Sequence, residues 1–164
     1  MKAKNCLIFG GSGQIGRSLI RKLTKNNFRV TVVTRNLHQK SYIIKTQANA
    51  GYIEIVEANI FEEIKLRELF KKADICINLI GILYEKKGGN SFKNIHKVFP
   101  SLLAKLSKEY KLKHLIHISA LGINEASDSH YATSKLEGEN EVLKNFPLAT
   151  ILRPSIVYSV DDDF

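Results

Sequence analysis

A short apolar segment near the N-terminus leads directly into a run of glycines and then into helix-period sequence. The apolar segment is Cys6-Leu7-Ile8-Phe9, and it is followed by Gly10-Gly11-Ser12-Gly13-Gln14-Ile15-Gly16. The glycines fit either of two spacings, Gly10-x-x-Gly13-x-x-Gly16 or Gly11-x-Gly13-x-x-Gly16. A strand, a glycine turn and a helix start in this order let the backbone approach a pyrophosphate, whose charge the helix N-terminus attracts. We therefore expect a dinucleotide-binding turn; a tight turn without a ligand is the alternative.

Strand-like and helix-like segments alternate along the chain. The expected strands are 4–9, 29–34, 52–56, 74–80, 112–119 and 148–152. The expected helices are 14–26, 61–72, 92–110 and 131–145, and the segment 37–50 is expected to be a long loop. Pro100 lies inside the third helix, where it predicts a kink or a fresh helix start. This alternation predicts an α/β fold of the Rossmann type, a doubly wound parallel sheet of six strands ordered 3-2-1-4-5-6.

The length of 164 residues suits a single domain with its own core, so we expect one dinucleotide-binding domain over 1–164. An acidic run, 161–163, follows the sixth expected strand. Cys6 and Cys76 lie in apolar runs without metal-ligand spacing, which predicts free thiols on neighbouring strands in a reducing, cytoplasmic compartment. No apolar run approaches the length of a membrane span, so we expect no transmembrane segment.

The formal net charge is +9, and no Asp or Glu precedes Glu54. Such a basic stretch suits an anionic partner: a phosphorylated cofactor, an acidic protein surface or a membrane leaflet. A solvated basic surface is the alternative. No basic motif with interleaved aromatic residues accompanies the charge, so we do not expect nucleic acid as a partner. The five histidines have no metal-like arrangement and are expected to be structural or surface residues.

A tyrosine and a lysine four residues apart form a second candidate site. Tyr131 and Lys135 would share one face of a helix, and a nearby ammonium favours the phenolate of a tyrosine that serves as an acid or base. Ser119 ends the fifth expected strand and would offer a hydroxyl at the carboxyl edge of the sheet, where ligands of this architecture bind. An exposed helix with an unrelated tyrosine and lysine is the alternative.

These features together resemble the extended or atypical short-chain dehydrogenase/reductase superfamily. The resemblance rests on the glycine turn, Asn78-Leu79-Ile80-Gly81, Ser119, Tyr131-x-x-x-Lys135 and Arg153-Pro154-Ser155. Within the superfamily, segments 78–83, 92–96, 117–122 and 151–155 are most similar to the accessory subunit of respiratory complex I that has this fold.

The resemblance implies a role for each matching residue. Ser119, Tyr131 and Lys135 would be the catalytic serine, tyrosine and lysine. The residues expected to contact a nicotinamide dinucleotide are Gly10, Gly13, Gln14, Ile15, Gly16, Asn59, Ile60, Asn78, Ile80, Gly81, Tyr131, Lys135, Pro154 and Ser155. Asn59 stands where the family often has an aspartate that contacts adenine, and its side-chain oxygen can accept the same hydrogen bond.

Arg35 predicts which dinucleotide binds. The end of the second strand lies beside the adenosine ribose in this fold, and an acidic residue there selects NAD. Here Val33-Thr34-Arg35-Asn36 offers no carboxylate, and the Arg35 guanidinium could bind a 2′-phosphate through two hydrogen bonds. An ordinary exposed arginine is the alternative. We therefore expect NADP(H) to be favoured over NAD(H).

The resemblance implies an NADP(H)-binding domain of the complex I accessory-subunit type, with the cofactor held mainly structurally. Its partners would be subunits of a membrane respiratory complex, and any membrane association would be peripheral, at the inner face. Family members continue past the sixth strand into a substrate-binding region, so we expect that lobe to be absent from 1–164. Two alternatives stay open: an active oxidoreductase or epimerase on a small carbonyl or sugar substrate, and an NAD(P)-sensing regulator.

Overall fold

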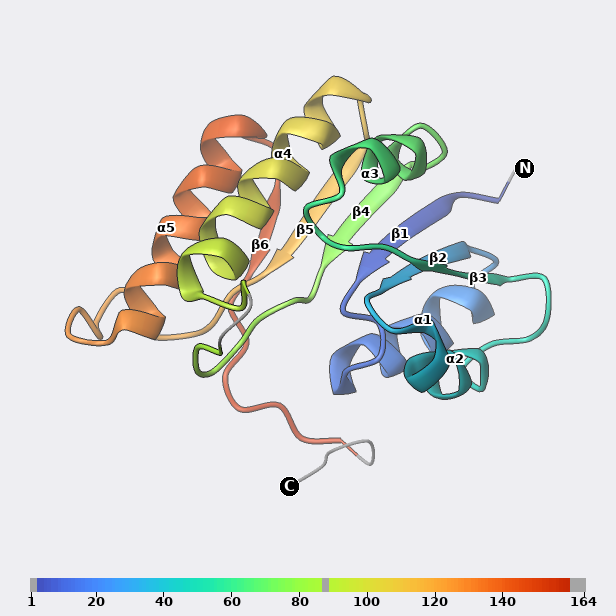
Figure 1. The fold of residues 1–164 in the computed structure, drawn as a ribbon, viewed down its shortest axis with the longest axis horizontal. Coiled ribbons are helices and arrows are strands. Elements are labelled where there is room, and N and C mark those ends of the chain that lie inside the picture. The colour runs from blue at the N-terminus through green and yellow to red at the C-terminus, as the bar shows by residue number, and fades with distance from the viewer. Residues whose placement is uncertain (1–2, 87–88, 160–164) are drawn as a thin grey trace. The chain divides into compact units, whose positions relative to one another are not determined.

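The computed structural model describes residues 3–86 and 89–159 (Figure 1), and the acidic run 161–163 lies outside them. The strands are β1 (Asn5–Phe9), β2 (Arg29–Thr34), β3 (Ile53–Glu57), β4 (Ile75–Asn78), β5 (His114–Ile118) and β6 (Thr150–Leu152). The α-helices are α1 (Gln14–Lys25), α2 (Leu37–Lys45), α3 (Glu63–Phe70), α4 (Phe99–Glu109) and α5 (His130–Asn145). A π-helical turn, η1 (Lys93–Val98), runs directly into α4.

The strands are ordered β3-β2-β1-β4-β5-β6. This order confirms the predicted doubly wound sheet. β1 pairs in parallel with β2 on one side and with β4 on the other. The direction of strand succession therefore reverses between β1 and β4, and ligands of open α/β sheets bind outside the carboxyl ends of the strands at such a reversal.

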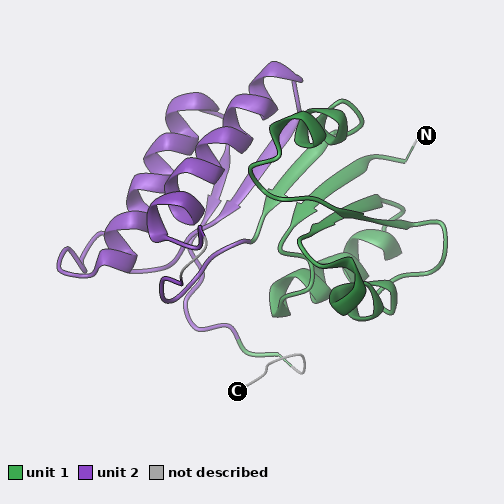
Figure 2. Ribbon diagram, in the orientation of Figure 1, with its two compact units in different colours: residues 1–79, 158–164 green, residues 80–157 purple. Residues whose placement is uncertain are grey.

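The chain divides into two compact units, which Figure 2 shows in different colours. Unit 1 comprises Met1–Leu79 and Tyr158–Phe164, and it carries β1 to β4 with α1 to α3. Unit 2 comprises Ile80–Val157, and it carries η1, α4, α5, β5 and β6.

The core of unit 1 forms because its central strands are apolar on both faces, as parallel strands covered by helices require. Leu7, Ile8 and Phe9 of β1 are all buried. α1 contributes the fully buried Ile20, and α2 contributes the fully buried Ile44. Both helices contact β2.

In unit 2, α4 and α5 pack against each other, and α4 contacts β5. The buried apolar side chains here include Phe99, Leu103 and Leu106 of η1–α4 and Leu115 of β5. The fresh helix start predicted at Pro100 is confirmed, since Pro100 stands in the first turn of α4. Proline is tolerated there because the first N–H groups of an α-helix have no partner within it.

The segment 37–50 was expected to be a loop, and this prediction is wrong. Most of it is α2, whose N-cap is Asn36: the Asn36 side chain accepts a hydrogen bond from the Gln39 N–H at 3.1 Å. Only Ile44 of this helix is buried. A helix with a single buried apolar residue has almost no periodic apolar pattern, so the Asn36 cap was the signal that could have identified it.

The prediction for the cysteines is confirmed: both are buried and free, on the neighbouring strands β1 and β4. Leu7, not Cys6, is the register partner of Cys76. Because successive side chains of a strand point to opposite faces, the two thiols lie on opposite faces of the sheet.

We expect both thiols to be unreactive in the folded protein and free after unfolding. Burial, with the nearby Asp74 carboxylate, raises the pKa of Cys6 to about 11, and burial raises the pKa of Cys76 as well. Since the thiolate is the reactive form, a disulfide reagent at neutral pH should modify neither cysteine quickly. The same titration in denaturant without reductant should recover two thiols. Recovery of none would contradict the unbonded arrangement.

Candidate functional site

The glycine turn follows the carboxyl end of β1. Gly10 has φ 84°, which a residue with a side chain rarely adopts, and its carbonyl accepts a hydrogen bond from the Gly13 N–H at 3.2 Å. Gly13 is the N-cap of α1, where it supplies no side-chain acceptor, and the first turn of α1 contains no acidic residue. The helix start is therefore suited to an anion that accepts hydrogen bonds from its N–H groups.

The glycines of the turn serve different purposes. A Cβ at Gly16 would lie 2.6 Å from the Gly10 carbonyl oxygen, and one at Gly11 would lie 2.6 Å from Val32 Cγ1, so packing alone requires both. A Cβ at Gly13 would meet only the Gly10 oxygen, at an ordinary 3.5 Å. Gly13 is also exposed. Packing does not explain its missing side chain, whereas close approach of a pyrophosphate would.

The residues expected to contact the dinucleotide are divided between the two units. Those in unit 1 are Gly10, Gly13, Gln14, Ile15, Gly16, Arg35, Asn59, Ile60 and Asn78. Those in unit 2 are Ile80, Gly81, Tyr131, Lys135, Pro154 and Ser155, and the candidate catalytic Ser119 lies in this unit as well.

On the adenosine side, Arg35 is exposed and follows β2 directly. Asn59 is exposed as well, but its Oδ1 accepts a hydrogen bond from the Phe61 N–H at 3.0 Å, within the turn that leads to α3. Ile60 is buried beside it. The acceptor expected to meet adenine is therefore engaged in a local turn in this structure.

Lys135, a member of the candidate catalytic group, is buried. It is 4% exposed, and its Nζ donates a hydrogen bond to the carbonyl oxygen of Ile118, at the end of β5, at 2.8 Å. Burial lowers the pKa of Lys135 to about 8, although the Glu139 carboxylate opposes the shift. Lys135 can therefore carry a positive charge at neutral pH while it is held against the strand end.

Tyr131 does not behave as the spacing predicted. The adjacent ammonium was expected to lower its pKa, but burial raises it. The reason is geometric, because the Lys135 ammonium donates to Ile118 instead. The prediction of a favoured phenolate is wrong for this structure, in which the neutral phenol is the stable form at neutral pH.

Ser119 lies beside an ion pair between the buried Glu139 and the exposed Arg153. Ser119 is 4% exposed, and its hydroxyl has no hydrogen bond of ordinary geometry among the described residues, yet it is near enough to Glu139 to help lower the pKa of that carboxyl. Burial raises the Glu139 pKa, but the Arg153 guanidinium, which donates from Nε at 2.9 Å, outweighs it. The Glu139 side chain is only 2% exposed. The pair fixes the chain after β6 to α5, and the Pro154 carbonyl accepts from the Leu121 N–H at 2.9 Å.

Sequence reasoning missed His96, Ser134 and Glu139 as members of this region. His96 and Ser134 form a buried hydrogen bond of 2.8 Å. The spacing of Tyr131, Lys135 and Glu139 at four-residue intervals was a usable signal for one shared helix face. Nothing in the sequence distinguished His96 from the other histidines.

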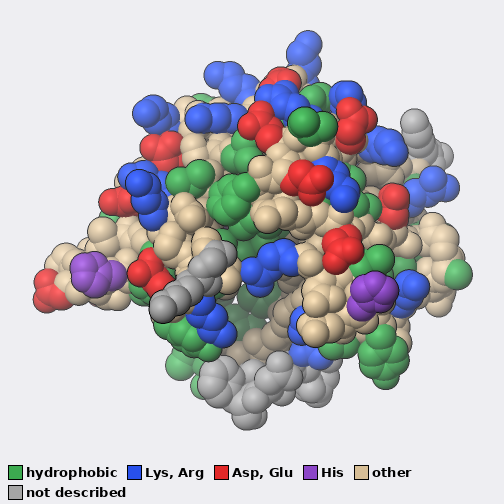
Figure 3. Space-filling model, viewed as in Figure 1, with side chains coloured by type: hydrophobic (Ala, Val, Ile, Leu, Met, Phe, Trp, Pro, Cys, Tyr) green, Lys and Arg blue, Asp and Glu red, His purple; other side chains and the backbone are tan. Residues whose placement is uncertain are grey.

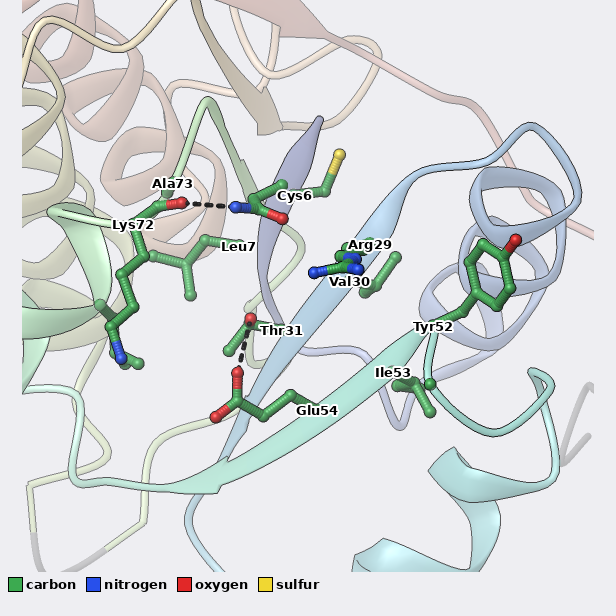
Figure 4. Close-up of a pocket in the computed structure, with 13 residues that line it drawn as sticks. Cys6, Leu7, Arg29, Val30, Thr31, Tyr52, Ile53, Glu54, Lys72 and Ala73 are labelled. Carbon is green, nitrogen blue, oxygen red and sulfur yellow. Dashed lines mark hydrogen bonds between the residues drawn. The ribbon is translucent and has the colours of Figure 1, made fainter. Parts of the chain in front are cut away.

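A cavity of about 310 Å³ in unit 1 lies at the amino ends of the strands, away from the carboxyl ends where the glycine turn lies (Figure 4). Its lining includes the first residues of three strands, Asn5, Arg29 and Ile53, together with Thr31, whose hydroxyl donates to Glu54 at 3.4 Å. Ligands of this architecture bind at the carboxyl ends of the strands. This cavity is therefore not a candidate for the dinucleotide.

Figure 3 shows Lys and Arg side chains spread over the visible face, with Asp and Glu side chains among them. On this face the positive charge is dispersed rather than gathered into one patch. Over residues 3–86 and 89–159, no helix is both long and apolar enough to cross a bilayer. The same residues contain no group of three His, Cys, Asp or Glu side chains that could hold a metal ion.

Relatives of the chain include subunits of a respiratory enzyme. The mitochondrial NADH-ubiquinone oxidoreductase 40 kDa subunit of Neurospora crassa is 26% identical over 155 residues, which are 94% of this chain and 41% of that protein. NADH dehydrogenase (ubiquinone) 1 alpha subcomplex subunit 9, mitochondrial, of Dictyostelium discoideum is 31% identical over 157 residues, 96% of this chain and 43% of that protein. The chain spans about two fifths of their length. These relatives confirm the resemblance to the complex I accessory subunit.

The fold is shared with nucleotide-sugar enzymes. The UDP-glucuronic acid 4-epimerase of Bacillus cereus, solved in complex with NAD, matches with a TM-score of 0.78 at 23% identity, covering 94% of this chain and 57% of that one. The family model described as NmrA-like matches residues 2–142, which include the glycine turn, Ser119, Tyr131 and Lys135. The chain therefore belongs to the NmrA-like family.

Proposed function

We propose that the chain binds a nicotinamide dinucleotide, favours NADP(H), and holds it mainly as a structural cofactor within a membrane respiratory complex. The observation that carries this proposal is the glycine turn, which lies at the strand-order reversal beside β1 and leaves Gly13 exposed for no packing reason. The NAD bound to the Bacillus cereus epimerase, a protein of the same fold, supports the class of ligand.

The residues present fit such a cofactor. The N–H groups at the start of α1 would hold the pyrophosphate, aided by the close approach that Gly13 permits. Lys135, buried and oriented by Ile118, would hold the nicotinamide ribose as it does in the superfamily it resembles. When bound, the dinucleotide would supply hydride-transfer chemistry, and the chain would supply its orientation.

Arg35 supports NADP(H) over NAD(H). It follows β2 directly and is exposed, so its guanidinium is accessible to a phosphate on the adenosine ribose. No acidic residue precedes Glu54, and the carboxylate beside the end of β2 is that of Glu57, which accepts a hydrogen bond from the Leu37 N–H at 3.1 Å. A guanidinium can bind a phosphate through two parallel hydrogen bonds.

The environments of Tyr131 and Ser119 support a cofactor that is bound structurally rather than one that is oxidised and reduced in a catalytic cycle. Burial raises the pKa of Tyr131, so its phenol is a weaker proton donor than one whose phenolate a nearby cation stabilises. The Ser119 hydroxyl, which would polarise a substrate carbonyl in the superfamily, is buried near Glu139. We take these two environments as support for a cofactor that is held rather than turned over.

The names of the relatives support the partner. Two of them are subunits of mitochondrial NADH-ubiquinone oxidoreductase, so we propose other subunits of such a complex as the partners of this chain. Within such a complex the chain would associate peripherally with the inner face of the membrane, through contacts with other subunits. In a cell without mitochondria, this face would be the cytoplasmic side of the membrane.

NADPH should bind more tightly than NADH by about tenfold to a hundredfold, the range that one charge-assisted hydrogen-bonded pair contributes. Replacing Arg35 with Ala should remove most of this difference and leave NADH binding nearly unchanged, because NADH has no 2′-phosphate. Fluorescence titration of both dinucleotides at low salt measures the two affinities. Equal affinities in the unaltered protein would contradict the NADP(H) assignment.

Replacing Lys135 with Met should weaken NADPH binding about tenfold or more, because the ammonium that binds the ribose is lost while the side chain keeps its size. Tyr131→Phe, the matched control, should leave binding nearly intact. With a panel of small carbonyl substrates, neither the unaltered protein nor Tyr131→Phe should oxidise NADPH above background. Robust oxidation that Tyr131→Phe abolishes would overturn the structural role in favour of an oxidoreductase.

A further inference from the structure

His96 occupies an unusual position in the backbone of unit 2. It is 1% exposed and lies in the π-helical turn η1, four residues before Pro100. Because proline has no N–H, the His96 carbonyl receives no α-helical hydrogen bond from that residue. The carbonyl instead faces Gly138 of α5, where a Cβ would lie 1.8 Å from its oxygen. Only glycine lets α5 approach η1 this closely.

Both ring nitrogens of His96 have hydrogen-bond partners from different segments. Nε2 lies 3.0 Å from the backbone nitrogen of Ile82, in the segment that follows β4, and Nδ1 lies 2.8 Å from Ser134 Oγ. A backbone N–H can only donate, so Nε2 must be the acceptor and Nδ1 must carry the proton. Nδ1–H then donates to Ser134, whose hydroxyl donates to the Tyr131 carbonyl at 2.7 Å. Each hydrogen bond in this series, from the Ile82 N–H to the Tyr131 carbonyl, therefore has one donor and one acceptor.

The ring of His96 also contacts the candidate catalytic tyrosine. Its centroid lies 5.4 Å from that of Tyr131 in an edge-to-face arrangement and 5.3 Å from that of Phe92, which stacks on it. A Cβ at Gly81 would lie 3.8 Å from His96 Nε2 and 3.9 Å from Lys135 Nζ. The imidazole thus stands among Gly81, Tyr131 and Lys135, all three expected to contact the dinucleotide.

The neutral ring is the form that makes these contacts. Burial and the Lys135 charge lower the pKa of His96 to about 4. A second ring proton would set an N–H of the imidazolium against the Ile82 N–H. At neutral pH the ring therefore keeps one donor and one acceptor in fixed directions.

We propose that His96 is a positioning residue that ties the segment 80–82 to the first turns of α5 and so fixes the nicotinamide side of the site before any cofactor binds. This inference rests on the proposed function only for the identity of the ligand. The two hydrogen bonds of the His96 ring lead to backbone groups at or next to residues that are expected to contact the dinucleotide. One reaches the N–H of Ile82, which follows Gly81, and the other reaches the Tyr131 carbonyl through the Ser134 hydroxyl. A site fixed in advance binds more tightly, because less chain must be ordered on binding.

If His96 only filled space in the core, the effect of replacing it would depend on the volume of the new side chain. If it links two segments through hydrogen bonds, the effect depends on which ring-nitrogen position keeps its hydrogen-bond partner. The amide of glutamine overlaps the Nε2 position and can accept from Ile82, whereas the amide of asparagine overlaps Nδ1 and can reach only Ser134. His96→Gln and His96→Asn are therefore matched variants that separate the two ends.

Amide hydrogen exchange followed by NMR tests the tie without any ligand. In His96→Asn the Ile82 amide should exchange about tenfold faster or more, and in His96→Gln it should stay within about threefold of the unaltered protein. NADPH affinity should follow the same order, about tenfold weaker in His96→Asn and nearly unchanged in His96→Gln. Equal effects of both variants on Ile82 exchange would show a core histidine and overturn the proposal.

Two further results keep the test decisive. If both variants fail to fold, the nitrogen-15 shifts of the His96 ring in the unaltered protein at neutral pH should identify the Nδ1–H tautomer, and an Nε2–H tautomer would overturn the tie. If the unaltered protein binds no dinucleotide but the exchange pattern holds, the proposed function fails while the tie stands.

Discussion

Parallel pairing of β1 with both β2 and β4 is the constraint on which the other features of unit 1 depend. It reverses the strand order at the point where the chain leaves β1, so the glycine turn emerges at the carboxyl edge, where this architecture binds ligands. The turn can close there because Gly11 packs against Val32 and Gly16 packs against Gly10. With those contacts made by the fold itself, the exposed Gly13 is the feature that packing leaves unexplained.

Unit 2 is organised around buried polar groups that are matched with partners. Lys135 donates to Ile118, Glu139 pairs with Arg153, and His96 links Ile82 to Ser134. Buried polar groups are costly unless they are hydrogen-bonded, so each of these pairs restricts how the surrounding segments can move. The same pairings hold the Lys135 ammonium against Ile118, while burial disfavours ionisation of Tyr131. These pairings are consistent with the proposed retention of a cofactor.

The sequence predicted the strand order because apolar and β-branched runs mark buried parallel strands, and their alternation with helices restricts the crossovers. It failed at α2, where one buried residue, Ile44, gives no periodic pattern. Within the site, the spacing of Tyr131 and Lys135 correctly predicted a shared helix, but not the direction of the ammonium. That direction depends on the end of β5, which is distant in sequence. The role of His96 was hidden for the same reason, because its partners lie 14 and 38 residues away.

A crystal structure of the protein with saturating NADPH would show where the dinucleotide binds. We predict the pyrophosphate on the N–H groups at the start of α1, the 2′-phosphate on Arg35 and the nicotinamide ribose on Lys135. NADPH bound elsewhere, for example in the cavity at the amino ends of β1 to β3, would contradict the proposed site, as would the absence of bound NADPH at saturation.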